Sequence, residues 1–389
     1  MKISIIVGGR FHAFNLAEEL DKSRYLKQLI TSYPKFFVRK NFDINNAKIK
    51  SLPLKEIVSR SGLNEYFNLD DKIIDYFDKK ASTLINLEDL DILVGWSSFS
   101  LNSFIKAKNY KCLKILERGS THIEHQRDIL KEEYDFYSIK PKIPSEYIVS
   151  KEKSEYELAD YISVPTEFVK QTFIDRGVNK DKIIKIPYGV NLDEFKQTNN
   201  ELKKNKSENE TFRIIYVGNC SVRKGIFYLM KSFVELNLKN SELLIVGNID
   251  KDIKHIMDLY LKNKNIKYIK AQKQNELYKL YNRSNLFVTC SVEEGLSMVQ
   301  LQAMSCGLPV ICTSNSGGDE IIDNSIEGFI LPIRDTVALK KKITLLYKDK
   351  NLCQKMGQKA KVKTINHYSW ENYGKNVIQN YQKLINDNK

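Results

Sequence analysis

The chain has 389 residues, of which 42% are apolar, and a formal net charge of +14. This length is greater than one hydrophobic core usually serves and predicts two domains of about 190 residues each. The apolar fraction is large enough to form a core in both domains. No apolar stretch approaches about 18 residues and prolines number only 8, so the composition excludes a transmembrane helix and extensive disorder.

The cysteines and the N-terminus both predict a cytoplasmic protein. The cysteines form no C-x-x-C pair and no other spacing typical of metal ligands, so we expect reduced thiols and no metal site. Residues 1–9 become polar too early for a signal peptide and are expected to form a buried first strand. The six cysteines are Cys112, Cys220, Cys290, Cys306, Cys312 and Cys353.

Short apolar runs alternate with longer amphipathic stretches along the chain, a pattern typical of β-α-β units on a parallel sheet. The strands predicted in the first half are Lys2–Val7, Ile92–Val94, Cys112–Leu116, Tyr161–Val164 and Lys182–Ile186. Those predicted in the second half are Arg213–Val217, Glu242–Val246, Ile266–Ile269, Leu286–Thr289, Pro309–Cys312 and Gly328–Leu331. Helices are expected between them, for example from Ala13, over 226–236 and over 274–281. The pattern predicts two doubly wound α/β domains with a cleft between them and ligands bound beyond the carboxyl ends of the strands.

The first sixth of the chain is strongly basic. Residues 1–60 contain twelve Lys and Arg against five Asp and Glu, and the segment Tyr33–Phe42 interleaves aromatic rings with cations. Such a surface can lie on an anionic bilayer, with its rings at the headgroups and its cations on phosphates. The alternative is an ordinary lysine-rich surface with Phe36 and Phe37 partly in the core. Nucleic acid is not an expected partner, because no recognised binding module accompanies the charge.

The stretch Tyr216–Gly225 predicts an anion site. An apolar run ends at Gly218, a short polar loop follows, and Arg223 and Lys224 stand just before the helix expected over 226–236. The start of a helix presents backbone N–H groups and a positive dipole end. Two cations there oppose that dipole, and a bound anion resolves the conflict. Arg223 offers a planar fork and Lys224 a point charge, which together suit a diphosphate.

A second stretch, Glu293–Gln302, places carboxylates in a turn before a helix expected over Ser297–Cys306. Carboxylates in that position can accept hydrogen bonds from the hydroxyls of a polyol. A diphosphate beside a polyol is the chemistry of a nucleotide sugar. The two stretches together therefore predict a nucleotide-sugar site.

These stretches and the motifs around them occur in the order typical of family 4 glycosyltransferases of the GT-B fold, which the chain resembles over most of residues 1–375. A lone Arg-Lys-Gly would be weak evidence, whereas the ordered set is specific. The other motifs are Ile3–Gly9, Leu113–His122, Ala159–Glu167, Ile186–Phe195, Cys306–Val310 and Ser316–Glu320.

The resemblance implies two Rossmann-like domains that face a central cleft. Residues 1–190 would bind the acceptor and residues 191–369 the nucleotide-sugar donor. The polar segment Gln197–Thr211 is expected to be an exposed loop near the boundary. The last helix of this fold crosses back to the first domain, and the amphipathic tail over 370–389 is expected to do so.

The resemblance also implies site residues in the first domain. Gly8 and Gly9 would abut the donor diphosphate, although a plain tight turn would also explain them. His122 would touch the donor sugar. The alternatives are that His122 is a buried structural histidine, or that His125, one turn later, takes the same role.

In the second domain, Arg223 and Lys224 would neutralise the leaving nucleotide. Many relatives carry an arginine directly after the strand glycine, where this chain has Asn219. Glu294 matches the first glutamate of the family's E-x7-E signature, which contacts donor sugar hydroxyls. The second signature position is Gln302, whose amide can still accept from a ribose hydroxyl, though less strongly than a carboxylate.

Two further features of the second domain belong to the resemblance. Glu320 matches another recurring acidic position and is expected to start a further helix. Backbone N–H groups at the start of a helix are expected to cap the phosphates. They belong to Gly295, Leu296, Ser297 and Met298.

The resemblance implies a retaining, metal-independent hexosyltransferase that uses a UDP- or GDP-sugar. No Asp-x-Asp metal signature stands in a plausible site, so we expect no metal and no cofactor beyond the nucleotide sugar. The expected acceptor is a glycan or a lipid-linked acceptor of surface polysaccharide or glycoconjugate biosynthesis, and the expected location is cytoplasmic, peripheral at the inner face of the membrane. A nucleotide-sugar 2-epimerase of the same fold and a non-catalytic glycosyltransferase partner subunit are the alternatives.

Overall fold

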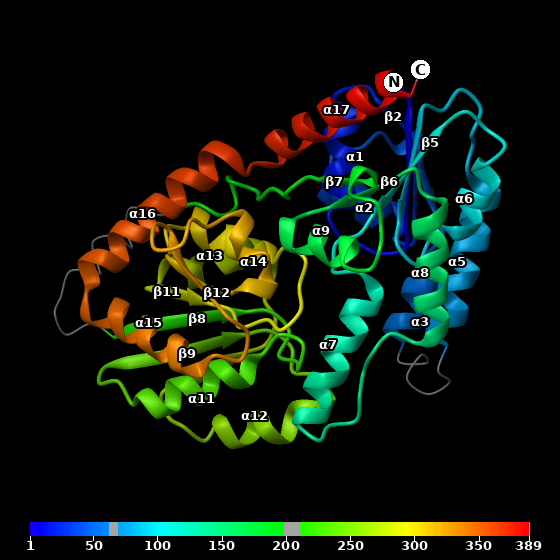
Figure 1. Cartoon of the computed structure of the whole chain (residues 1–389). Coiled ribbons are helices and arrows are strands. Elements are labelled where there is room, and N and C mark those ends of the chain that lie inside the picture. Colours follow the sequence, from blue (N-terminus) through cyan, green and yellow to red (C-terminus); the bar gives the residue numbers. More distant parts are fainter. Residues whose placement is uncertain (62–68, 198–210, 389) are drawn as a thin grey trace.

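The computed structural model describes residues 1–61, 69–197 and 211–388. Two separate parallel β-sheets, one of seven and one of six strands, lie side by side with helices packed around them (Figure 1). This is the doubly wound α/β architecture that the alternating pattern predicts. The loop expected over Gln197–Thr211 falls almost entirely on residues 198–210, outside the described residues.

The first sheet is built from strands of the first half of the chain. They are β1 (Ile3–Val7), β2 (Leu26–Thr31), β3 (Ile49–Ser51), β4 (Ile92–Trp96), β5 (Leu113–Glu117), β6 (Tyr161–Val164) and β7 (Ile183–Lys185). Their order in space is β3-β2-β1-β4-β5-β6-β7, and every neighbouring pair is parallel. Strand β1 is buried at every position, which explains its continuous apolar sequence.

The second sheet follows the same plan. Its strands are β8 (Phe212–Val217), β9 (Ser241–Val246), β10 (Ile266–Ile269), β11 (Leu286–Val288), β12 (Val310–Thr313) and β13 (Gly328–Leu331). Their order is β10-β9-β8-β11-β12-β13, again with parallel pairs throughout. The order reverses between β8 and β11, so the loops that follow these two neighbouring strands meet at one edge, where such sheets bind ligands.

All the predicted strands occur, within two residues at each end. The sequence does not predict β2 and β3. In β2 the apolar residues Leu26, Leu29 and Ile30 are separated by Lys27 and Gln28, a spacing typical of a helix, and Gln28 is nevertheless buried. Strand β3 has only three residues at the edge of the sheet, which is too short for a pattern.

The helices of the first half are α1 (Ala13–Lys22), α2 (Lys35–Asn41), α3 (Leu54–Arg60), α5 (Asp70–Leu84), α6 (Leu101–Ala107), α7 (Ile123–Phe136), α8 (Glu146–Leu158) and α9 (Glu167–Ile174). Those of the second half are α11 (Ile226–Leu236), α12 (Lys254–Tyr260), α13 (Gln274–Asn282), α14 (Met298–Ser305), α15 (Thr336–Lys348) and α16 (Lys350–His367). The last helix is α17 (Trp370–Asp387). The helices predicted from Ala13, over 226–236 and over 274–281 are confirmed. None of the described helices is both long and apolar enough to cross a membrane.

Two helices cross between the halves (Figure 1). Helix α17 leaves the second half and packs against α1, as predicted for the C-terminal tail. Helix α7 begins in the first half, and its later residues Leu130 and Tyr134 belong to the core of the second half. The boundary between residues 190 and 191 stays a prediction.

The far end of α7 is fixed by polar contacts to the second half. The Arg334 guanidinium lies 2.7 Å from a carboxylate oxygen of Glu132 and 2.6 Å from one of Glu133. Glu133, which is fully buried, also accepts a hydrogen bond of 2.7 Å from the Tyr228 hydroxyl. The two halves are therefore joined by α7 as well as by the chain connection and α17.

Candidate functional site

The loop after β8 is held tightly against the loop after β11. Gly225, just before α11, has a φ of +60°, and a Cβ added to it would lie 2.0 Å from the carbonyl oxygen of Cys290. Only glycine fits this position. The backbone N–H of Val292 donates to the carbonyl oxygen of Arg223 at 2.9 Å. The predicted Arg-Lys loop and the predicted Glu-Glu turn thus form one unit.

The two cations face the two carboxylates of that unit. The Nε atom of Arg223 donates to Glu293 Oε2 at 2.7 Å, and its Nη2 atom lies 3.4 Å from Glu294 Oε1. The Lys224 ammonium contacts the other carboxylate oxygen of Glu294. Burial of Lys224 and the neighbouring charge of Arg223 lower the pKa of the ammonium to about 7. Lys224 is therefore a cation whose charge depends on a nearby anion at neutral pH.

Glu293 connects this unit to the first half of the molecule. Its Oε1 atom accepts hydrogen bonds from the hydroxyls of Ser120 at 2.6 Å and Thr121 at 2.7 Å, and from the Thr121 backbone N–H at 3.2 Å. Its Oε2 atom also accepts from Gln126 at 3.2 Å. Burial raises the pKa of Glu293, but the charge of Arg223 and the hydrogen bonds from Ser120 and Thr121 outweigh it and lower the pKa to about 2. The sequence singles out Glu294 and gives Glu293 no separate role.

The turn at Gly295 touches the first half directly. A Cβ added to Gly295 would lie 2.0 Å from the carbonyl oxygen of Gly119. The Gly295 carbonyl oxygen accepts a hydrogen bond of 3.3 Å from the Thr166 hydroxyl. Ser297 then precedes α14, and no side chain of the described residues caps the start of that helix. Of the residues whose backbone N–H groups are predicted to bind phosphate (Gly295, Leu296, Ser297 and Met298), Gly295 thus lies where the halves meet, and the N–H of Ser297 already donates to the Ser316 carbonyl oxygen at 3.3 Å.

The glycines after β1 accommodate aromatic rings of the protein itself. A Cβ on Gly8 would lie 2.1 Å from the ring of Phe99, and one on Gly9 would lie 2.5 Å from the ring of Phe11. These close contacts fit the alternative of a tight turn, because they explain both glycines without a bound ligand. The next residue, Arg10, reaches the second half, where its Nη2 atom donates to Gln274 Oε1 at 3.3 Å.

His122 is a buried helix cap. Its Nδ1 atom accepts from the backbone N–H of Glu124 at 3.3 Å, and its ring lies 5.0 Å from the rings of Tyr156 and Phe173. Burial, reinforced by the charge of Arg118, lowers its pKa to about 4. No contact with Arg223, Lys224 or Glu294 occurs within the described part of the chain. These contacts fit the alternative interpretation of His122 as a buried structural histidine.

His125 lies one turn further along α7, and the charge of Glu293 acts on it. Its Nε2 atom is buried and has no hydrogen-bond partner among the described residues. Its ring centroid lies 6.0 Å from that of Phe168. Of the two histidines, His125 is the one on which the charge of Glu293 is seen to act.

The remaining predicted residues differ in their surroundings. The Asn219 side chain is exposed, and its carbonyl oxygen accepts from the Tyr216 hydroxyl at 2.7 Å. Gln302 is buried in α14, and its Oε1 atom accepts from the Tyr281 hydroxyl at 3.1 Å. Its Nε2 atom has no partner among the described residues, so the amide keeps both of its N–H donors for another group.

The prediction that Glu320 starts a helix is wrong. Glu320 is the last residue of the 3₁₀ turn η6 (Gly318–Glu320), which follows Gly317 in the left-handed conformation and is not continued by an α-helix before β13. The carboxylate lies 2.9 Å from the ammonium of Lys185 in the first half. It is another ionic contact between the halves.

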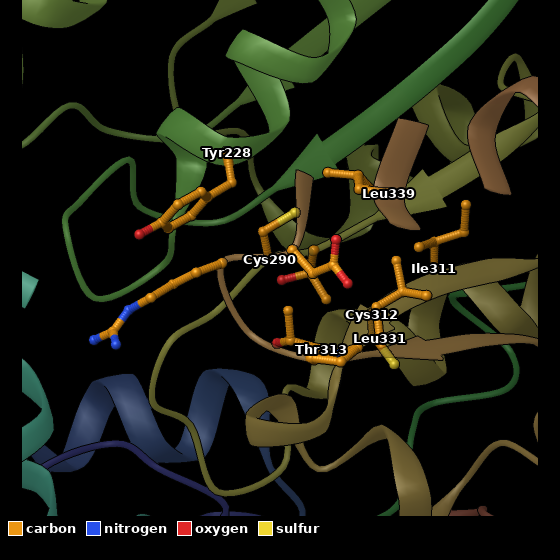
Figure 2. A pocket seen from close by; sticks show the side chains of 11 residues that line it. Tyr228, Cys290, Ile311, Cys312, Thr313, Leu331 and Leu339 are labelled. Atoms are coloured by element: carbon orange, nitrogen blue, oxygen red, sulfur yellow. The ribbon is translucent and has the colours of Figure 1, made fainter. Parts of the chain in front are cut away.

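A small pocket lies beside the Arg-Lys loop, within the second half (Figure 2). Its walls are mostly apolar and include Cys290 and Cys312, whose thiol pKa burial raises to about 12. Neither Arg223 nor Lys224 nor Glu294 lines it. The pocket is therefore a packing space behind the loop and separate from the candidate site. No group of three or more potential metal-binding side chains occurs among the described residues.

The two parallel sheets, with paired cations at the switch point of the second, define an α/β protein of the GT-B type. Residues 197–363 match the family of glycosyl transferases group 1. This part of the chain resembles that family, and the family match together with the names of the relatives supports a glycosyltransferase.

Individual relatives agree with this assignment. An uncharacterized glycosyltransferase, MJ1069, of Methanocaldococcus jannaschii is 26% identical over 92% of this chain and 88% of that protein. The capsular polysaccharide biosynthesis glycosyltransferase CapM of Staphylococcus aureus is 29% identical over 54% of this chain and 59% of CapM. The structure of Anabaena HepE in complex with UDP superimposes with a TM-score of 0.72 at 11% identity, over 98% of this chain and 100% of HepE. The last likeness shows the GT-B fold alone.

Proposed function

We propose that this protein is a retaining glycosyltransferase that moves a sugar from a UDP- or GDP-sugar to a glycan or lipid-linked acceptor in surface polysaccharide or glycoconjugate biosynthesis. The observation that carries the proposal is the pair Arg223 and Lys224 at the switch point of the second sheet, opposite Glu294 and beside the first half. Two adjacent cations at the start of a helix suit a diphosphate. The UDP complex of HepE and the capsular role in the name of CapM support the donor and acceptor classes.

The chemistry follows from the charges. The bond from the sugar to the nucleotide breaks as negative charge builds on the leaving diphosphate, which Arg223 and Lys224 stabilise. The leaving phosphate accepts the proton of the acceptor hydroxyl as that oxygen bonds to the sugar carbon on the same face. Neither an enzymic nucleophile nor a metal ion enters this scheme.

Glu294 changes partners in this proposal. Its carboxylate pairs with Lys224 and Arg223, the same cations that the diphosphate needs. A diphosphate carries more negative charge than one carboxylate and displaces it from the cations. The released carboxylate then accepts hydrogen bonds from the sugar hydroxyls. Binding of the donor therefore moves Glu294 from the cations to the sugar.

His125 is the histidine proposed to face the donor sugar. Burial lowers the pKa of His125 against the opposing charge of Glu293, so the ring is neutral at pH 7. A neutral imidazole with a free ring nitrogen can accept a hydrogen bond from a sugar hydroxyl. The unpartnered Nε2 atom supports this role.

A thermal-shift panel with UDP, GDP and ADP, in the presence and absence of EDTA, tests the proposal. UDP or GDP at about 100 times its dissociation constant should stabilise the protein by roughly 2.7 kcal/mol. EDTA should leave that shift unchanged, because side chains meet the charge of the diphosphate. The absence of a shift with every nucleotide would contradict the proposed function, and a shift that EDTA abolishes would contradict the metal-independent scheme.

We also propose that the basic surface of the first half contacts an anionic membrane. Large apolar side chains are exposed in the segments that follow three neighbouring strands: Phe11 after β1, Phe36 after β2 and Ile57 after β3. Phe36 is 74% exposed on α2, where Val38 alone is buried. Cations accompany the rings, which is the composition of a surface that binds headgroups and acyl chains together.

The protein should sediment with anionic vesicles at low salt and less so above physiological salt, because salt screens exposed charges. The triple change of Lys35, Arg39 and Lys40 to Glu should abolish sedimentation, and Phe36→Ser should weaken it at all salt concentrations. The matched control changes three exposed lysines of the second half, Lys341, Lys348 and Lys350, to Glu. Equal loss in the two triple variants would contradict the assignment of this surface.

A further inference from the structure

Glu293 is a buried anion where the proposed function needs cations. Its carboxylate is fully buried between the halves and stays ionised, with a pKa of about 2. Negative charge beside a site for a diphosphate opposes binding of the diphosphate. A role for Glu293 must therefore come from what the carboxylate holds in place.

The Glu293 carboxylate fixes the orientation of the Arg223 guanidinium. Nε of Arg223 donates to Glu293 Oε2 at 2.7 Å and to the Glu293 carbonyl oxygen at 3.1 Å. The Nη2 atom points to the Ser120 hydroxyl at 3.3 Å and to Glu294 at 3.4 Å. No described residue accepts from Nη1. The contacts to Glu293 thus fix the guanidinium through Nε and leave its outer edge for a ligand.

The other carboxylate oxygen of Glu293 is held by the first half. Three donors from Ser120 and Thr121 converge on Oε1, in the loop that follows β5. Gln126, which donates to Oε2, itself accepts from Arg118 at 2.8 Å. Arg118 is in turn paired with Glu152, and both side chains are buried. The position of Glu293 therefore depends on the first half being closed against the second.

We propose that Glu293 is a positioning residue that orients the Arg223 guanidinium toward the donor diphosphate, and that it does so only while the loop Ser120–Thr121 of the first half is docked on it. The proposal rests on the proposed function, in which Arg223 binds the diphosphate. It adds that closure of the two halves completes the diphosphate site.

The test is a double-mutant cycle on nucleotide affinity, measured by calorimetry with UDP and GDP as probes. Glu293→Gln removes a negative charge but keeps the size of the side chain. With Arg223 present, we expect this change to weaken binding by about fivefold or more, because the hydrogen bonds that orient the guanidinium involve charged groups. In an Arg223→Met background we expect the same change to tighten binding, because only the unfavourable charge is left to remove.

This reversal of sign separates the possible roles of Glu293. Tighter binding in both backgrounds would mean that Glu293 acts through its charge alone, and weaker binding in both would mean that it only supports the fold. Either result overturns the inference and leaves the proposed function intact. The absence of UDP, GDP and ADP binding to the wild-type protein would overturn both.

Two further variants keep the test decisive if Glu293→Gln does not fold. Thr121→Val leaves Glu293 and Arg223 in place and removes one hydroxyl donor from the first half, so it should weaken UDP or GDP binding about threefold when Arg223 is present and have no effect in the Arg223→Met background. An effect of equal size in both backgrounds would overturn the inference. The matched control is Arg334→Ala, which removes a different ion pair between the halves and should leave nucleotide affinity within about twofold.

Discussion

Lys224→Ala is expected to lower donor turnover by about 100-fold or more while the protein stays folded, the usual consequence of losing one preorganised charge in an active site. The side chain contacts Glu294 and lies beside Arg223, and the loop between β8 and α11 contains no cation besides these two. Turnover is measured as release of UDP or GDP from the donor, and folding by thermal unfolding.

The control for this change is Lys231→Ala on α11, the helix that follows the loop of Lys224. Lys231 is exposed and forms only a surface pair with Glu235 at 4.0 Å. Its removal should leave turnover unchanged, because exposed pairs of this kind contribute little. Full turnover in a folded Lys224→Ala protein would contradict the diphosphate assignment.

The pKa of Lys224 adds a dependence on pH. Because burial and Arg223 lower this pKa to about 7, the free protein loses the ammonium as the pH rises above 7. A bound diphosphate stabilises the charged form and raises the pKa, so at pH 8, where roughly one-tenth of the free lysine is protonated, binding should take up close to one proton. Affinity should accordingly fall as the pH rises above 7. Calorimetry in buffers of different ionisation enthalpy measures the uptake, which Lys224→Arg should abolish.

The sequence predicts the placement of this site better than its contacts. The loops after β8 and β11 meet because the two strands are neighbours in a parallel sheet, a consequence of the alternating pattern. Two adjacent carboxylates at one turn, Glu293 and Glu294, look alike in sequence. Only the fold shows that Glu293 faces inward to Ser120 and Thr121, whereas Glu294 faces Lys224.

The same limit applies to the first half. Position 8 must be glycine because a side chain there would collide with the ring of Phe99. Phe99 is far along the chain, so no local sequence pattern predicts that contact. His122 and His125 are separated by less than one helical turn, and loop position favours His122. The burial of His122 between Tyr156 and Phe173 depends on α8 and α9, which bring these rings from further along the chain, and is a tertiary effect.

Gly295→Ala is expected to lower donor turnover by about 100-fold or more with only a modest loss of stability. The added Cβ would lie 2.0 Å from the carbonyl oxygen of Gly119 and 3.2 Å from the ring of Pro165, both in the first half. Neither Gly295 nor Gly119 can move away from the other without its surroundings. The backbone on each side of Gly119 is held, by the bond from Arg118 N–H to the Ser163 carbonyl at 2.9 Å and by the contacts of Thr121 to Glu293. The halves themselves must therefore separate.

A separation of about 1 Å is enough to misplace groups that must meet a reacting ligand together. It would draw the Ser120–Thr121 loop away from Glu293 and shift the backbone N–H groups at the start of α14. Overpacking of this kind costs about 1–3 kcal/mol, so the variant should still fold and unfold cooperatively at a lower temperature.

The matched control is Gly357→Ala, in which the added Cβ would lie 2.1 Å from the carbonyl oxygen of Gly307. This is the same kind of clash against the same kind of group, but both residues belong to the second half and neither touches the site. Gly357→Ala should therefore lose a similar amount of stability and keep most of its turnover. If the two variants lost turnover equally at equal stability, the contact between Gly295 and Gly119 would have no specific part in forming the site.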